Sequence, residues 1–292
     1  MDTVLFCDSN CEIWYDLAEH YKLNVIYMPY SIDGNESFYD LGRNTDFKEF
    51  YAKIRKGSIP LTSALNEYNY TEYFEPFLKE GKDILYISFS HKLSATFESM
   101  NKAIAALKEK YPKNEIVCID SKNISMGAGA VVLEAAKYFA QGGVIKADLI
   151  KKIEQLKSNV RTLFAVDDLH HLKRGGRISG AAAVFGSLLG IKPLLKITQE
   201  GKIENFAKAK GRKKSMLMLL DNAEKAGIDT TQPVYMVDAD APDAPVFAQL
   251  FSERFTNAAQ VYRQPVGPVI GTHCGPGTLG LIFFTKEVSA HE

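Results

Sequence analysis

Ile84-Leu85-Tyr86-Ile87-Ser88-Phe89-Ser90 is a short, β-rich apolar run that passes directly into serines. The same pattern occurs at 4–9, which ends in Asp8-Ser9, and at 116–121, which ends in Asp120-Ser121. Segments with helical periodicity lie between these runs, at 45–56, 67–80 and 94–111. Strands that alternate with helices predict a parallel sheet with covered faces. Ligands bind outside the carboxyl ends of such strands, so the sequence predicts these polar residues at the rim of a site.

A second set of strands and helices is expected after residue 160. Helices at 128–140 and 146–159 precede this point, and helices at 213–226 and 244–255 follow it. The predicted strands of the second set are 162–166, 194–197, 202–208, 233–238 and 279–285. Because 292 residues exceed the usual size of one domain, we expect an α/β protein with two domains, at 1–160 and 161–292, although segments could cross between them.

Composition excludes several classes of protein. The chain has 35 basic and 35 acidic residues, so no net field attracts nucleic acid or anionic membranes. The four cysteines form no CxxC pair, which argues against a disulfide framework or a zinc site. The first residues lack a basic segment followed by a long apolar run, so a cytoplasmic location is expected.

The glycine-rich stretch at 267–280 is the strongest signal of a binding site. It holds five glycines, two prolines, two threonines and His273 within fourteen residues. This composition predicts a fixed loop whose backbone N–H groups and one imidazole hold an anion. Residues 275–280 also match GxGxxG, but no acidic residue follows about twenty positions later, so a dinucleotide site is not expected. No phosphate-binding GxxxxGK[ST] motif occurs.

Hydroxyl and basic residues supply further candidates, each with a structural alternative. Thr62-Ser63 and Ser94-Ala95-Thr96 occur at turns, where they either cap helices or contact an anion. The segment 172–179 joins three cations to a Gly-Gly turn, and the small apolar residues after it indicate a core helix or a helix that lines a cavity. A second basic cluster at 208–214 indicates a local anion site or a protein-docking patch.

Taken together, these motifs resemble the DegV family of bacterial fatty-acid-binding proteins. The resemblance rests on Asp8-Ser9, 60–63, 87–96, 172–179, 191–195, 211–214 and 267–280, in that order along nearly the whole chain. It implies two α/β domains, a parallel sheet in the first and a mixed sheet in the second, that enclose an acyl chain between them. The fold is similar to the substrate-binding unit of dihydroxyacetone kinases. The chain would be a non-catalytic carrier that presents a long-chain fatty acid to a separate fatty acid kinase.

The resemblance also implies roles for individual residues. The carboxylate would meet Thr62, Ser94 and His273, with Ser63 and Thr272 nearby, and the tunnel or its mouth would include Ala95, Thr96, Phe185, Leu188 and Ile191. Basic residues at the mouth or at the kinase-docking surface would be Arg174, Arg177 and Arg212. No metal or cofactor is expected on this chain, since ATP and Mg²⁺ would reside on the kinase, and membrane contact would be at most transient.

The chain departs from the family pattern at three places. Ala95 stands within a usual Ser-Gly-Thr, Ala64-Leu65-Asn66 replaces a more typical Gln-Pro-Ser, and Cys274 replaces a common threonine. These changes affect the crowding near the carboxylate and the shape of the tunnel.

Two enzymatic alternatives remain open from the sequence. A serine-dependent lipid hydrolase or acyltransferase would use Ser94 with His273 and either Asp120 or Asp8, although the GxSxG nucleophile elbow is missing. A kinase subunit for a small hydroxylated substrate would instead hold its substrate covalently on His273.

Overall fold

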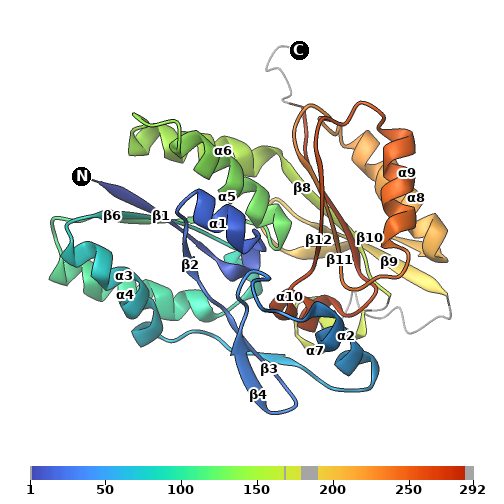
Figure 1. Ribbon diagram of the computed structural model, residues 1–292, viewed down its shortest axis with the longest axis horizontal. Coiled ribbons are helices and arrows are strands. Elements are labelled where there is room, and N and C mark those ends of the chain that lie inside the picture. The colour runs from blue at the N-terminus through green and yellow to red at the C-terminus, as the bar shows by residue number, and fades with distance from the viewer. Residues whose placement is uncertain (1, 168, 179–189, 287–292) are drawn as a thin grey trace.

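The computed structural model describes residues 2–167, 169–178 and 190–286 (Figure 1). Its first sheet has four parallel strands in the order β2-β1-β6-β7. These strands are β1 (Thr3–Asp8), β2 (Asn24–Ile26), β6 (Asp83–Ser88) and β7 (Ile116–Asp120). Every residue of β6 is buried, as the uninterrupted apolar run predicts for a central parallel strand.

Helices cover both faces of this sheet. In Figure 1, α3 (Glu67–Lys79) and α4 (Thr96–Lys110) lie on one side, and α5 (Met126–Phe139) and α6 (Lys146–Asn159) lie on the other. The short helix α1 (Tyr15–His20) follows β1. The helix caps agree with local sequence: Asn66 and Asn69 form a capping box at the start of α3. The alternation of strands and helices predicted for this half is confirmed.

The second sheet has six strands in the order β10-β9-β8-β13-β11-β12. Among the strand pairs of this sheet that the structure describes, only β11 and β12 are parallel, so the sheet is mixed. The strands are β8 (Val160–Ala165), β9 (Ile191–Ile197), β10 (Ile203–Lys210), β11 (Val234–Asp238), β12 (Val261–Pro265) and β13 (Leu279–Phe284). Helices α8 (Arg212–Lys225) and α9 (Ala244–Arg254) cover its outer face (Figure 1).

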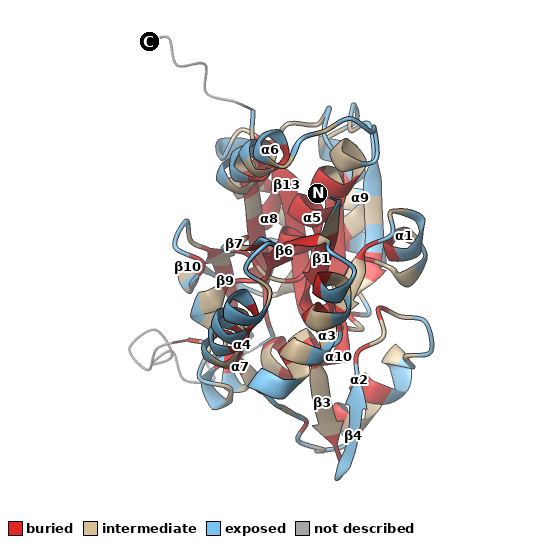
Figure 2. Cartoon of the chain, turned by 90° about the vertical axis from the view of Figure 1, so that its left-hand side faces the viewer, coloured by how far each residue is buried: buried red, intermediate tan, exposed pale blue. Residues whose placement is uncertain are grey.

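Helix α5 joins the two halves into one buried core. It packs against α6 of the first half and against β8, β11 and β13 of the second. Its first turns are rich in glycine and alanine, which allow close approach: a Cβ at Gly129 would collide with the carbonyl oxygen of Cys11. Figure 2 shows α5 among the buried elements at the centre of the molecule. The same apolar cluster includes Tyr235 and Ile282 from the second sheet.

A small third sheet was not predicted. Its order is β4-β3-β5, with β3 (Pro29–Ile32), β4 (Asn35–Phe38) and β5 (Leu61–Thr62), and helix α2 (Phe47–Arg55) lies between β4 and β5 in the chain. The sheet matters because its shortest strand places Thr62 opposite Tyr30. Within the described ranges, no helix combines the length and the apolar character that crossing a bilayer requires.

The prediction of a loop at 267–280 is wrong for the first half of this stretch. Residues Pro268–Cys274 form the helix α10, which begins with proline at its first position, a common place for that residue. Two glycines of this stretch make room for aromatic side chains, and they do not serve to expose backbone N–H groups to a ligand. A Cβ at Gly271 would collide with the Tyr51 hydroxyl, and one at Gly267 would collide with the Tyr39 ring. Two positive-φ glycines, Gly275 and Gly277, then connect α10 to β13.

Candidate functional site

A cavity between the two large sheets encloses about 930 Å³ of empty space, including its mouth. Both halves of the chain line it, and most of the wall is apolar. Representative residues are Met28, Phe89 and Ile124 from the first half and Phe164, Val237 and Ile282 from the second.

Polar side chains gather on part of this wall. The Oγ1 atom of Thr62 lies 3.0 Å from Nε2 of His273, although 211 positions separate them in the chain. Ser63, Ser94 and Arg177 line the same cavity. Three local structures bring them together: β5 carries Thr62, α10 carries His273, and the 3-10 turn η2 (His91–Leu93) ends at Ser94. Ser63 is exposed and Thr62 and Ser94 are half-buried, so this polar end lies at the surface.

The environment of His273 keeps its imidazole neutral. Burial, together with the positive charges of Arg177 and Arg174, lowers the pKa of His273 to about 4. At neutral pH one ring nitrogen therefore carries a proton and can donate a hydrogen bond, and the other can only accept one. Beside it, the guanidinium of Arg177 donates through Nε to the carbonyl oxygen of Leu93 at 3.0 Å and also donates to Gly175. Hydroxyls, a neutral imidazole and one guanidinium are donors suited to a carboxylate.

Not all of the predicted residues lie on the wall. Thr96 lines the cavity, but its hydroxyl is bonded to Leu65 and Tyr70, while Ala95 lines an adjoining outer recess. Thr272 is buried and donates to Pro268 within α10. Ile191 lies in β9 opposite Lys210 and is not part of the described wall. Phe185 and Leu188 lie outside the described residues.

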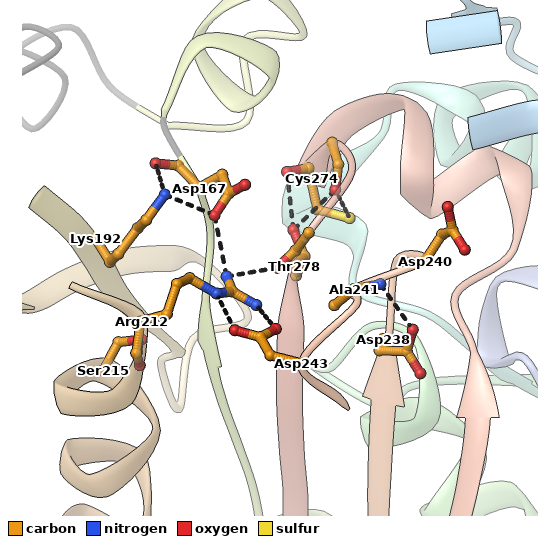
Figure 3. A network of polar contacts seen from close by, with 12 residues as sticks. Asp167, Lys192, Arg212, Ser215, Asp238, Asp240, Ala241, Asp243, Cys274 and Thr278 are labelled. Carbon is orange, nitrogen blue, oxygen red and sulfur yellow. Dashed lines mark hydrogen bonds and ion pairs between the residues drawn. The ribbon is translucent and has the colours of Figure 1, made fainter. Parts of the chain in front are cut away.

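The three basic residues that the sequence predicted for the mouth or the docking surface lie in different places. Arg177 lines the cavity, whereas Arg174 is exposed beside His171. Arg212 begins α8 and donates to both carboxylate oxygens of Asp243, at 2.7 and 2.5 Å (Figure 3). It also donates to Asp167 at 3.0 Å and to the carbonyl oxygen of Gly277 at 2.7 Å. Its charge is therefore engaged in a network that ties α8 and α9 to the segment before β13, away from the described cavity wall.

The strand-end residues Asp8 and Ser9 do not form the rim of the site. Asp8 is buried, and its Oδ2 accepts hydrogen bonds from the Tyr86 hydroxyl at 2.8 Å and the Phe89 N–H at 3.0 Å. Ser9 accepts a bond from the Met28 N–H. Sequence reasoning missed the next residue, Asn10, whose side chain does line the cavity. The signal was present, since Asn10 directly follows a predicted strand end.

The geometry does not support a catalytic triad. A serine–histidine–carboxylate arrangement needs an acid on the second ring nitrogen, yet Nδ1 of His273 has no hydrogen-bond partner within the described chain. Asp8 is engaged with Tyr86 and Phe89, and Asp120 accepts a bond from the Lys122 N–H.

Gly175 makes room for the His273 ring. A Cβ at this position would collide with Nδ1 of His273, and the backbone of Gly175 is otherwise compatible with alanine. We therefore expect Gly175→Ala to lower the free energy of unfolding by about 1–3 kcal/mol through overpacking, as urea denaturation would measure. In a His273→Ala background the added methyl group meets no ring, so the same substitution should have little effect. An equal loss in both backgrounds would contradict this contact.

Comparisons with known proteins agree in the family they indicate. A model described as an uncharacterised protein of the DegV family matches residues 3–286. A DegV domain-containing protein of Clostridium perfringens is 37% identical, covering 97% of this chain and 98% of its own length. A Thermus thermophilus structure, described as fatty acid binding of a DegV family protein, has a TM-score of 0.84 and 26% identity, over 98% of this chain and 100% of that one. DegV from Bacillus subtilis, described as a fatty acid binding protein, has a TM-score of 0.80 and 28% identity over the same shares.

Proposed function

We propose that this chain, which belongs to the DegV family, is a carrier that encloses a long-chain fatty acid and presents its carboxylate to a separate ATP-dependent fatty acid kinase. The observation that supports this most is the cavity itself, which is mainly apolar and includes the Thr62–His273 pair in its wall. The two solved relatives described as fatty-acid-binding proteins support the choice of ligand.

The apolar wall supplies the affinity. Burial of hydrocarbon contributes about 0.8 kcal/mol per methylene, so about 14 methylenes contribute on the order of 11 kcal/mol before the costs of ordering the chain. The head group then needs orientation more than additional binding energy.

The polar end fits a carboxylate that must remain reactive. Thr62, Ser63, Ser94 and His273 offer neutral donors, and Arg177 provides one positive charge nearby. Neutral donors hold a carboxylate without the strong neutralisation that a cluster of cations would cause. The exposed Ser63 and Ala95 put this end where a partner can reach it. In this proposal the kinase supplies ATP and Mg²⁺, and no step of the chemistry belongs to this chain.

Mass spectrometry of the purified protein under denaturing conditions tests the carrier function. We expect a copurified fatty acid, and we expect delipidated protein to take up palmitate or oleate in equimolar amount. Repeated preparations that contain no lipid and also take up neither acid would contradict the proposal.

A further inference from the structure

Two sulfur atoms and one imidazole meet beside β7, the edge strand of the first sheet. The Sγ atom of Cys118, in β7, lies 3.7 Å from Sδ of Met100, in α4, and 4.0 Å from Nε2 of His91, in η2. None of these three residues lines the cavity between the two large sheets. A thiol donates only weakly and a thioether accepts only weakly, so hydrogen bonding gives little reason for this arrangement.

The separations of these atoms are close to those around a three-coordinate metal ion. With bonds of about 2.3 Å to sulfur and about 2.0 Å to nitrogen, and angles of about 110–120°, two sulfur ligands lie about 3.8–4.0 Å apart. A sulfur and a nitrogen ligand then lie about 3.5–3.7 Å apart. The observed distances are 3.7 Å between the sulfur atoms and 4.0 Å between sulfur and nitrogen, so small side-chain shifts would complete the geometry.

The cluster is open to solvent on one side and fixed on the other. Cys118 and His91 are both partly exposed, and His91 also lines the outer recess that contains Ala95. Met100 is fully buried, so the core holds its side chain in place. An ion can therefore enter from the surface and meet a ligand that does not move.

Packing also orients the imidazole. The ring of His91 stacks on Phe97, with 3.9 Å between the ring centroids and 27° between the planes. Its Nε2 lies 2.8 Å from the Ser88 hydroxyl, which has a second acceptor in the carbonyl oxygen of Ile119 at 3.5 Å. Ser88 can therefore release Nε2, and a ligand that is already oriented loses little entropy when a metal binds.

We propose that Cys118, Met100 and His91 bind one Cu(I) ion. A set of thiolate, thioether and imidazole ligands suits this soft ion. No group of three His, Cys, Asp or Glu side chains among the described residues could hold a metal ion, so the site needs the thioether of Met100. On binding, the thiol proton leaves to solvent, and the thiolate and Cu(I) together carry no net charge, which suits a half-buried position. The inference does not depend on the proposed function.

Anaerobic competition with a chromophoric Cu(I) chelator tests the site on the whole chain. We expect the wild type to bind one equivalent of Cu(I) and Cys118→Ala to abolish this binding. Met100→Leu conserves volume and removes the sulfur, so it should weaken binding by at least about tenfold, the lower limit typical of losing even an outer-shell partner of a metal. His91→Gln should weaken binding by a similar factor.

The matched control is Met216→Leu, which makes the same change at a buried position of α8 and should retain the wild-type affinity. X-ray absorption at the copper edge requires no variant, and the wild-type complex should show two sulfur atoms at about 2.3 Å and one nitrogen at about 2.0 Å. Three results would each overturn the proposal: no stoichiometric binding of Cu(I), coordination by sulfur alone, or an affinity that neither Cys118→Ala nor Met100→Leu lowers.

Discussion

Replacing Ile124 by tryptophan is expected to weaken fatty-acid binding by at least about a hundredfold while the protein stays folded. Ile124 lies between β7 and α5, is partly buried, and lines the cavity where clusters from both halves meet. An indole at this position would occupy space that the acyl chain needs. Excluding about four methylenes removes about 3 kcal/mol of binding free energy, which corresponds to a factor above 100.

The measurement is a palmitate titration with two control variants. The chain has a single tryptophan, so the new indole also reports ligand entry through its fluorescence. Ile124→Leu conserves volume and should bind nearly as well as the wild type. Ile145→Trp places the same side chain at an exposed position, 62% accessible, and should leave binding unchanged. Wild-type affinity in a folded Ile124→Trp variant would show that the acyl chain lies elsewhere.

The helices and strands that the sequence predicted correctly are those with a clear hydrophobic pattern of their own. Helix α6 was predicted with both ends correct, because its charged face and apolar periodicity are regular. Strands β1, β6 and β7 were predicted from their apolar runs. The third sheet could not be predicted in this way. All four residues of β4 are exposed, and β5 has two residues, so neither strand carries a hydrophobic pattern and both depend on tertiary contacts.

Helix α10 shows how burial overrides local propensity. Its seven residues include a proline and an internal glycine, which are typical of a loop. The glycine is explained by Tyr51, a residue more than 200 positions earlier whose hydroxyl occupies the space of a Cβ and donates to the carbonyl oxygen of Val266 at 2.7 Å. A single sequence contains no sign of such a contact.

The candidate site was predicted in part. The family resemblance implies Thr62, Ser94 and His273 as site residues, and the structure places all three on one cavity wall. The resemblance could not distinguish Arg177, which lines the cavity, from Arg212. The carboxylate partners of Arg212, Asp167 and Asp243, are distant in the sequence. Charge alone does not reveal whether a cation is already paired.

The carboxyl group of Glu12 is buried where three segments of the chain meet. Glu12 is 1% exposed and has a left-handed backbone, with φ of 55°. One carboxyl oxygen accepts from the N–H of Gly267, which precedes α10, and the other accepts from the hydroxyl of Ser125, which precedes α5. Gln264 donates to its backbone carbonyl oxygen. The residues that precede α10 and α5 are therefore both bound by this one carboxyl group.

Stability is expected to fall as the pH rises from about 5 to 8, because of Glu12 and Asp8. Burial raises the pKa of Glu12 to about 8, although its bonds to Ser125 and Gly267 lower it, and burial raises the pKa of Asp8 to about 7. Both values exceed those of the unfolded chain, near 4. The folded protein therefore retains protons that the unfolded chain releases, and the stabilisation disappears as the pH passes the folded pKa. For Glu12 alone, the change is on the order of 3 kcal/mol.

Urea denaturation at pH 5, 6.5 and 8 measures this dependence, and Glu12→Gln isolates the contribution of Glu12. Glutamine resembles the protonated acid: its oxygen can accept from Gly267, and its amide can donate to the Ser125 oxygen. The variant should match the wild type within about 1 kcal/mol at pH 5 and exceed it at pH 8, since it never carries the buried charge. The residual pH dependence of the variant would then belong to Asp8 and, with the opposite sign below about pH 6.5, to His273, whose pKa is lowered in the folded protein. A wild-type stability that rises from pH 5 to 8, or a variant with the same slope as the wild type, would mean that Glu12 is ionised in the folded protein throughout this range.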